Sequence, residues 1–254
     1  MLKYNTLKYF FWGICIAAIL YSFYKQEVYL FFYLTLILIW LIYITVGAFR
    51  MRAAIFLPSV SSLPHASKKN ILITFDDGPH PEITPQILKI LKQAQATAIF
   101  FCVGKNMDRY PDIVKQIVAE GHLIANHSYN HSNLIGIYST EKVKAEILQT
   151  EETIIKQVGS SLKLYRPPFG VTNPNIAKAV SVLNMKVIGW NKRSFDTVSK
   201  TKEEVLKRIT PDLKNGDIVL FHDTNTLTPA ILADFLLFAS NKGFIFEVSS
   251  PFEV

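Results

Sequence analysis

The sequence contains little cysteine and no repeated or low-complexity segment. Cys15 and Cys102 are the only two cysteines among 254 residues. Cys15 lies in an apolar run and Cys102 in an expected buried strand. We therefore expect no disulfide, and cysteine content does not indicate a redox compartment. Because no internal repeat is evident, the sequence does not indicate a repeat array.

The chain beyond residue 69 also lacks an excess of charge of either sign. It carries 20 Lys and Arg against 19 Asp and Glu, a net charge of +1. A nucleic-acid-binding domain needs a basic face of its own, so we expect no nucleic-acid partner. The basic excess lies in residues 1–69, where the balance is 7 − 1 = +6. The charged residues of this part are Lys3, Lys8, Lys25, Arg50, Arg52, Lys68 and Lys69, with Glu27 as the single acid. Their cations flank apolar runs, a placement that suits anionic lipid headgroups.

Two apolar runs, 9–24 and 28–49, have no internal charge, and only Lys25, Gln26 and Glu27 separate them. The second is long enough to span a bilayer, and the first becomes so when Leu7 and Lys8 are added. No small-residue cleavage pattern follows the first run, which disfavours a signal peptide. We therefore expect a multi-pass anchor over 1–49, with transmembrane helices at about 8–24 and 28–49, in a bacterial inner membrane. A single span or a re-entrant hairpin is the alternative.

Beyond residue 70, apolar strand-like runs alternate with helix signals, which indicates a parallel α/β sheet, either a barrel or an open doubly wound sheet. The expected strands are 71–75, 98–103, 122–126, 163–166, 186–190, 217–221 and 244–248. The helix signals include Thr84-Pro85, Asn173-Pro174 and Thr201 as starts and Gly159 as an end. Residues 50–69, with Pro58 and Pro64, are expected to form a linker, followed by one domain over 70–254.

Polar residues at the ends of five different strands favour the barrel. They are Asp76 and Asp77, His127, Arg166, Trp190 and His222. In (β/α) barrels the carboxyl ends of successive strands converge on one mouth, where catalysis takes place. An open sheet would instead concentrate such residues at one switch point.

Asp77, His127 and His131 predict a metal site. One carboxylate and two imidazoles give three ligands and leave coordination positions open, an arrangement that suits a divalent metal, Zn²⁺ first and Co²⁺, Ni²⁺ or Mn²⁺ as alternatives. The neighbouring Asp76 is then free to act as a base toward water activated by the metal. These residues indicate a metal-dependent hydrolase.

Four motifs together resemble the polysaccharide deacetylase family, the NodB-homology domain of carbohydrate esterase family 4. They are Thr74-Phe-Asp-Asp-Gly-Pro79, His127-x-x-x-His131, Arg166-Pro-Pro-Phe-Gly170 and Leu220-Phe-His222. The resemblance covers about residues 70–250, with the motifs in the family's order. It implies a distorted (β/α)7 TIM-like barrel that removes N- or O-acetyl groups from a carbohydrate substrate with the help of a divalent metal.

The resemblance also implies a role for each matching residue. Asp77, His127 and His131 match the metal ligands, Asp76 the catalytic base, and Arg166 the arginine that pairs with this base. His222 matches the general acid, which protonates the departing amine, and Asp196 matches the acid that orients it. In the substrate pocket, Trp190 lines the acetyl site, and Phe169, which follows Pro168, offers its backbone N–H to the oxyanion. Phe169 stands where the family commonly has tyrosine.

The family's fourth motif is altered in this chain. The family often reads Asp-x-x-Asp-Trp, and the corresponding stretch here runs from Arg193 to Thr197, with only Asp196 retained. The residues at the rim of the pocket therefore differ from the family's, and the identity of the sugar polymer stays open.

Three functions remain as alternatives at this point. The first is N-deacetylation of a glycan, peptidoglycan or lipid-linked oligosaccharide, and the second is O-deacetylation of an esterified polysaccharide such as acetylxylan. The third is a non-catalytic, membrane-anchored glycan-binding protein. The charges around the apolar runs place both ends of the chain in the cytoplasm by the positive-inside rule. Anchored polysaccharide-modifying domains are expected outside the cell, so the side of the membrane stays open.

Overall fold

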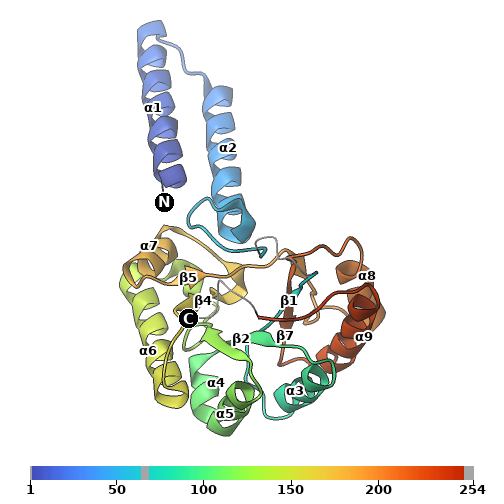
Figure 1. The fold of residues 1–254 in the computed structure, drawn as a ribbon. Coiled ribbons are helices and arrows are strands. Elements are labelled where there is room, and N and C mark those ends of the chain that lie inside the picture. The colour runs from blue at the N-terminus through green and yellow to red at the C-terminus, as the bar shows by residue number, and fades with distance from the viewer. Residues whose placement is uncertain (1, 64–68, 249–254) are drawn as a thin grey trace.

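The chain folds into a hairpin of two long helices and an α/β domain in the computed structural model, which describes residues 2–63 and 69–248 (Figure 1). One parallel sheet of seven strands organises the domain, in the order β5-β4-β3-β2-β1-β7-β6. The strands are β1 Leu72–Asp76, β2 Ala98–Cys102, β3 Leu123–Asn126, β4 Leu164–Tyr165, β5 Lys186–Val187, β6 Lys192–Arg193 and β7 Ile218–His222. The sheet is curled, with β5 and β6 at its two edges, which confirms the predicted α/β fold of seven strands as a distorted, incompletely closed barrel.

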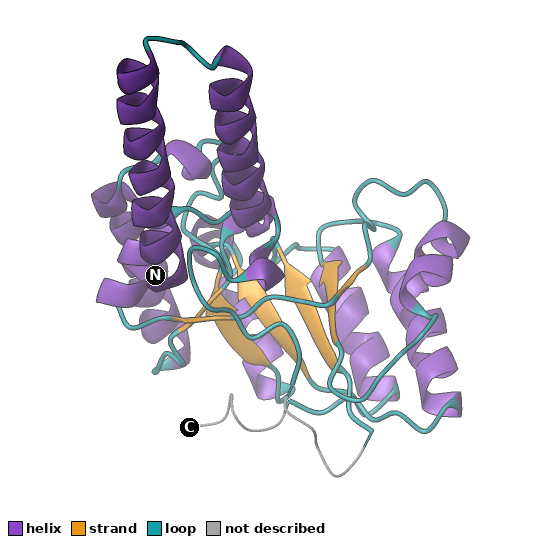
Figure 2. Ribbon diagram, turned by 90° about the horizontal axis from the view of Figure 1, so that it is seen from above, coloured by secondary structure: helices purple, strands orange, loops and turns teal. Residues whose placement is uncertain are grey.

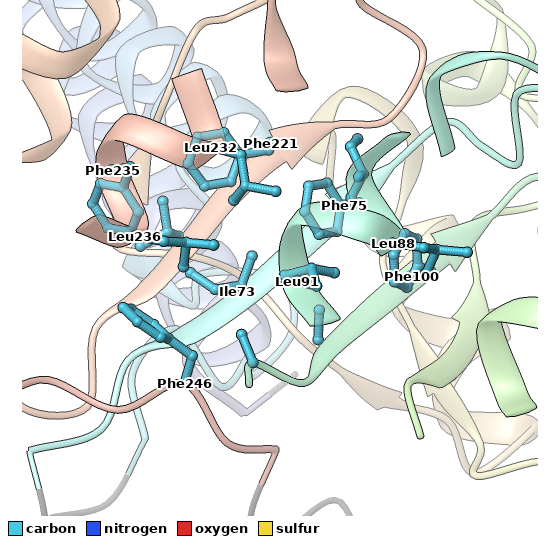
Figure 3. Close-up of a cluster of buried hydrophobic side chains, with 14 of the residues drawn as sticks. Ile73, Phe75, Leu88, Leu91, Phe100, Phe221, Leu232, Phe235, Leu236 and Phe246 are labelled. Atoms are coloured by element: carbon cyan, nitrogen blue, oxygen red, sulfur yellow. The ribbon is translucent and has the colours of Figure 1, made fainter. Parts of the chain in front are cut away.

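Helices surround the sheet and bury its outer face, so that the central strands β1, β2 and β7 are covered on both sides. This is why these strands are continuous apolar runs rather than alternating ones. Figure 3 shows the outer core, in which Phe75, Phe100 and Phe221 from the sheet lie close to Leu88 and Phe235 from two flanking helices. The ring centroids of Phe75 and Phe100 are 4.8 Å apart.

The helices of the domain begin and end largely where the sequence indicates. They are α3 Ile83–Gln93, α4 Gly104–Arg109, α5 Pro111–Ala119, α6 Thr140–Val158, α7 Pro174–Val182, α8 Lys202–Ile209 and α9 Thr228–Asn241, with short 3-10 turns η1 Met51–Ala53, η2 Ile135–Ile137 and η3 Pro168–Gly170. Asn173 and Thr201 accept the expected capping hydrogen bonds from Ile176 and Glu204. Thr84 is not a cap as expected, because α3 already begins at Ile83. Gly159 ends α6 with a φ of 90°, a conformation that favours glycine.

The prediction of a strand over 244–248 is wrong. Only Ile245 forms an isolated bridge, to Asn70, and its neighbours bond elsewhere: the Thr97 N–H donates to the carbonyl of Phe246. The segment crosses the amino ends of β1 and β2 and divides its hydrogen bonds between them. The seventh strand is instead β6, whose two residues come shortly after β5 in the chain but lie at the opposite edge of the sheet.

Residues 50–63, expected as a linker, pack against the domain between the two edges of the sheet. The Val60 N–H donates to Val187 and the Gly189 N–H to Val60, at 2.9 and 2.8 Å, beside β5. A few residues later the Leu63 N–H donates to Gly216, just before β7. The segment therefore covers the gap that the incomplete barrel leaves open.

The helices α1 Leu2–Lys25 and α2 Leu30–Phe49 form an antiparallel hairpin that protrudes from the domain (Figures 1 and 2). Both are long and apolar enough to cross a membrane, and almost none of their residues are buried within the protein. The base of α2 is fixed to the domain, because Thr172 donates from its hydroxyl to Gly47 and from its N–H to Ala48, at 2.6 and 2.9 Å.

Candidate active site

The structure brings Asp77, His127 and His131 together although fifty residues separate the acid from the histidines. Their candidate ligand atoms all lie within 4.8 Å of one another. Asp77 Oδ1 lies 3.4 Å from His127 Nε2 and 3.0 Å from His131 Nε2. The three residues come from the loops after β1 and β3, at the carboxyl end of the sheet.

The protonation of His127 suits a metal ligand. Its Nδ1 lies 2.7 Å from the Arg166 carbonyl oxygen, an acceptor, so this nitrogen carries the proton and Nε2 presents its lone pair toward Asp77. A lone pair that faces a carboxylate needs a cation or a proton between them. The donor set of one oxygen and two imidazole nitrogens thus fits a divalent cation such as Zn²⁺.

The carboxylate and the imidazole shift each other's pKa strongly. Burial by itself would raise the pKa of Asp77, but hydrogen bonds and charge from His127 and His131 outweigh it and hold that pKa far below its usual range. Burial would likewise lower the pKa of His127, and the charges of Asp76 and Asp77 raise it instead. The site therefore stabilises positive charge between these side chains.

The loop that carries the two histidines is fixed to α6. The Glu146 carboxylate accepts hydrogen bonds from the backbone N–H groups of Tyr129 and Asn130, at 3.1 and 2.8 Å. At the start of the loop, Asn126 donates to Glu151 and accepts from the Ser128 N–H. These contacts hold the loop in shape and explain the polar residues of the motif, which we interpret as structural rather than chemical.

Asp76 forms a buried ion pair with Arg166. Arg166 Nη1 lies 2.6 Å from Asp76 Oδ1, and the arginine side chain is fully buried. The same guanidinium donates to Thr74 Oγ1 and to the carbonyl oxygens of Ile188 and Gly189. Four acceptors therefore hold the Arg166 side chain, and Arg166 in turn fixes Oδ1 of Asp76. The other carboxylate oxygen, Oδ2, lies 3.7 Å from His127 Nε2.

His222 and Asp196 form a second hydrogen-bonded pair beside Asp76. His222 Nδ1 lies 2.7 Å from Asp196 Oδ1, and the His222 N–H donates to Asp196 Oδ2. Ser194 and Thr228 donate their hydroxyls to the same carboxylate at 2.8 Å, so that Asp196 is fully bonded. The register of β1 and β7 places Asp76 and His222 directly opposite each other.

Asp196 makes His222 a stronger base than a free histidine. Burial would lower the pKa of His222, but the hydrogen bond and charge of Asp196, together with the charges of Asp76 and Asp77, raise it to about 9. The imidazole is therefore protonated at neutral pH and can donate a proton from Nε2, because Nδ1 faces Asp196.

The three predicted substrate residues lie at the same mouth. Phe169 has a φ of 60°, which is unusual for a residue with a side chain, and its ring lies 4.6 Å from that of His131. Pro168 is buried at the start of η3. The half-buried Trp190 ring packs where a side chain on Gly170 would lie, and its centroid is 5.4 Å from the Arg166 guanidinium. The structure thus brings all ten predicted site residues to one end of the sheet.

Sequence reasoning missed one buried acid, Asp223. Its carboxylate accepts from the Thr84 hydroxyl at 2.7 Å and from the backbone of Gly78, and any side chain on Gly78 would strike it. Burial, aided by the charge of Asp77, raises its pKa to about 7. Asp223 thus fixes the turn that carries Asp77. Its position directly after His222, at a strand end, is a signal that could have identified it.

Fold and site together define the class of protein: an α/β-barrel enzyme with a candidate cation site of three donors at the carboxyl end of its strands. The polysaccharide deacetylase family model matches residues 64–188. A peptidoglycan-N-acetylglucosamine deacetylase of Bacillus cereus is 36% identical over 189 residues, which are 72% of this chain and 88% of that protein. The chain belongs to the polysaccharide deacetylase family, which confirms the resemblance seen in its motifs.

Two further proteins extend the comparison. A chitooligosaccharide deacetylase of Azorhizobium caulinodans is 31% identical over 62% of this chain and 75% of its own length. The crystal structure of a peptidoglycan N-acetylglucosamine deacetylase in complex with a substituted N-oxidanyl-benzamide has a TM-score of 0.69 at 32% identity, over 75% of this chain and 90% of that one. The chain spans 57% and 41% of the length of other peptidoglycan-N-acetylglucosamine deacetylases that it matches.

Proposed function

We propose that this protein is a metal-dependent hydrolase that removes acetyl groups from N-acetylated sugars of a glycan. The observation that carries the proposal is the convergence of three units on one mouth: the Asp77–His127–His131 cluster, the Asp76–Arg166 ion pair and the His222–Asp196 pair. The names of the relatives, which act on peptidoglycan or chitooligosaccharide, support the substrate class.

Each unit has a distinct task in amide hydrolysis. Asp76, oriented by Arg166, accepts a proton from the attacking water, and His222 donates a proton to the sugar nitrogen as the C–N bond breaks. Water and the N-acetyl sugar thereby yield acetate and the free amine. Trp190 lines the space for the acetyl methyl, and the Phe169 N–H, on a backbone fixed beside His131, donates to the oxygen that becomes negative in the transition state.

Asp77, His127 and His131 would hold the cation. We propose Zn²⁺, because two imidazoles and one carboxylate with open positions match its preferences, with Co²⁺, Ni²⁺ and Mn²⁺ as alternatives. When bound, the cation supplies Lewis-acid polarisation of the acetyl carbonyl and lowers the pKa of water.

We also propose that α1 and α2 anchor the protein in a membrane as two spans, and that 1–49, 50–69 and 70–254 are its anchor, connecting segment and catalytic domain. The length and hydropathy of the two helices support the anchor. Their apolar surface is exposed to solvent in isolation: Phe31 is 85% and Tyr24 is 80% exposed. So large an apolar surface is costly in water.

The direct test is acetate release by the purified full-length protein in detergent with Zn²⁺ or Co²⁺. Chito-oligosaccharides and peptidoglycan fragments are suitable substrates. We expect acetate and free amine in equal amounts. A wild-type protein that releases no acetate from any of these glycans, and so equals His127→Ala, contradicts the proposal.

Replacing His222 with alanine separates amide from ester cleavage. We expect amide hydrolysis to fall about 10²–10⁴-fold, since the amine leaves poorly without a proton. Hydrolysis of an acetylated xylan should fall much less, because an alkoxide is a better leaving group. Acetate release from both substrates, measured side by side, checks this. Equal losses on amide and ester would show that His222 has another task.

Replacing Asp196 with asparagine is expected to move the alkaline limb of the pH–activity profile to lower pH. In the wild type this limb reflects loss of the His222 proton, whose pKa is about 9. Because a cation bound to Asp77 offsets part of the negative charge that raises the pKa of His222, we expect the limb at or below pH 9. Loss of the adjacent carboxylate charge lowers the pKa by about 1–3 units. A profile of kcat against pH gives the shift, and an unmoved limb would exclude His222 as the titrating acid.

A further inference from the structure

Several loops at the carboxyl end of the sheet carry exposed apolar side chains. They lie on the loops that follow β3, β4 and β6, at Leu134, Ile137, Phe169, Phe195 and Val198. Ile137 is 78% and Val198 is 74% exposed, and exposed apolar side chains that are grouped on one surface are typical of an interaction site. We call these five residues the apolar rim. The first two loops are joined, because Asn173, just beyond η3, donates to the carbonyl of Gly136 at 2.8 Å.

The helical hairpin is attached beside the apolar rim. Thr172, whose two hydrogen bonds fix the end of α2, lies only three residues after Phe169. Residues 244–248 mark the other end of the sheet, since they bond to the amino ends of β1 and β2. In Figure 2 the hairpin rises on the side of the sheet away from that end. The base of the hairpin therefore lies at the same end of the sheet as the mouth and the apolar rim.

Two guanidinium groups lie within the apolar rim. Those of Arg193 and Arg208 lie 4.5 and 5.2 Å from the centroid of the Phe195 ring. Neither forms an ion pair with an acid within residues 2–63 and 69–248, and Arg193 Nε is buried without a hydrogen-bond partner. Arg193 also lies 5.5 Å from the ring of Trp190 and so reaches the substrate pocket. An unpaired guanidinium next to a pocket suits a phosphate group.

We infer that the mouth docks on the lipid surface from which the hairpin emerges, and that the substrate is an N-acetylated sugar joined to a membrane lipid through phosphate. The inference rests on the proposed deacetylase function and deepens it. Apolar side chains with interspersed cations bind an anionic bilayer surface. Because the apolar rim lies next to the apolar hairpin, we identify the bilayer as the surface that the rim contacts. A docked mouth meets sugars held close to the membrane, and Arg193 faces the phosphate that joins sugar to lipid.

The experiment compares acetate release by the full-length protein, reconstituted in phosphatidylcholine–phosphatidylglycerol vesicles, from two substrates. One is polyprenyl-diphosphate-linked N-acetylglucosamine in the vesicles, and the other is a soluble chito-oligosaccharide. We expect the lipid-linked sugar to be preferred. Ile137→Asp and Val198→Asp should each lower the ratio of the two activities at least about tenfold, since each takes an aliphatic side chain out of the lipid. Leu237→Asp, on an exposed site of α9 outside the rim, is the matched control and should leave the ratio unchanged.

A second measurement does not depend on activity. In a Cys15→Ser background, an environment-sensitive fluorophore on Ile137→Cys should be quenched by lipid-borne quenchers, and one on Leu237→Cys should not. Equal accessibility of both positions to aqueous quenchers overturns docking. A soluble glycan cleaved as fast as the lipid-linked sugar, with no effect of the rim variants, overturns the substrate class and leaves the deacetylase intact. Absence of acetate from both substrates counts against the proposed function itself, and the quenching result then still decides docking.

Discussion

Replacing His127 with alanine is expected to remove both cation binding and acetate release. The imidazole contributes Nε2 to the cluster, 3.4 Å from Asp77, and alanine has no donor atom to put in its place. Changing a group that merely orients a metal ligand costs about 10–100-fold in affinity or activity, and loss of a ligand itself should cost more. Metal content after dialysis and the rate of acetate release measure the two effects.

The control for this variant is His80→Ala. His80 lies close in sequence to the Asp76-Asp77 turn, but its Nδ1 accepts from the backbone N–H groups of Glu82 and Ile83 and so serves the start of α3. We expect this variant to retain the cation and the activity. If His127→Ala keeps a full complement of metal while its unfolding transition is unchanged, the three-donor site is not where the cation binds.

Replacing Arg166 with leucine is expected to lower the free energy of unfolding by about 3–5 kcal/mol and to abolish activity. The fully buried guanidinium is the partner of Asp76, and its removal leaves a carboxylate without its counter-charge inside the protein. The carbonyl oxygens of Ile188 and Gly189 also lose their donor. Denaturant unfolding in detergent gives the change in stability.

A double variant separates the charge from the packing. In an Asp76→Asn background, Arg166→Leu should cost clearly less stability than in the wild type, because no buried negative charge is left unpaired. Activity is absent in either case, so the comparison depends on unfolding alone. If the two substitutions simply add, the ion pair makes no contribution of its own to the fold.

Much of the fold could be predicted because the central strands are long, apolar and separated by capped helices. β1, β2 and β7 lie within one residue of their expected positions, since five consecutive buried residues in β1 and β2, and four in β7, leave a clear pattern. β6 could not be predicted, because a strand of two residues, Lys192 and Arg193, has no periodicity to detect. Residues 244–248 have the composition of a strand, but they cross the ends of β1 and β2 instead of extending the sheet.

The site could be predicted because its residues follow strand ends in a parallel sheet, where topology alone brings them together. The contacts that hold them could not. Thr74 bonds to Arg166 and Thr228 to Asp196 across more than thirty positions of sequence, and a lone threonine has no distinguishing pattern. The packing of residues 50–63 into the open side of the barrel was equally hidden, because a stretch with a proline and three serines resembles a linker until its partners are known.

Metal-dependent acetate release tests the central claim most directly. The purified full-length protein is treated with a chelator, assayed on an N-acetylated chito-oligosaccharide, and assayed again after Zn²⁺ or Co²⁺ is added back. The account predicts that the chelator removes activity, that about one cation per chain restores it, and that Asp77→Ala responds to neither treatment. Activity that survives complete removal of metal, or that is equal in Asp77→Ala and the wild type, would contradict it.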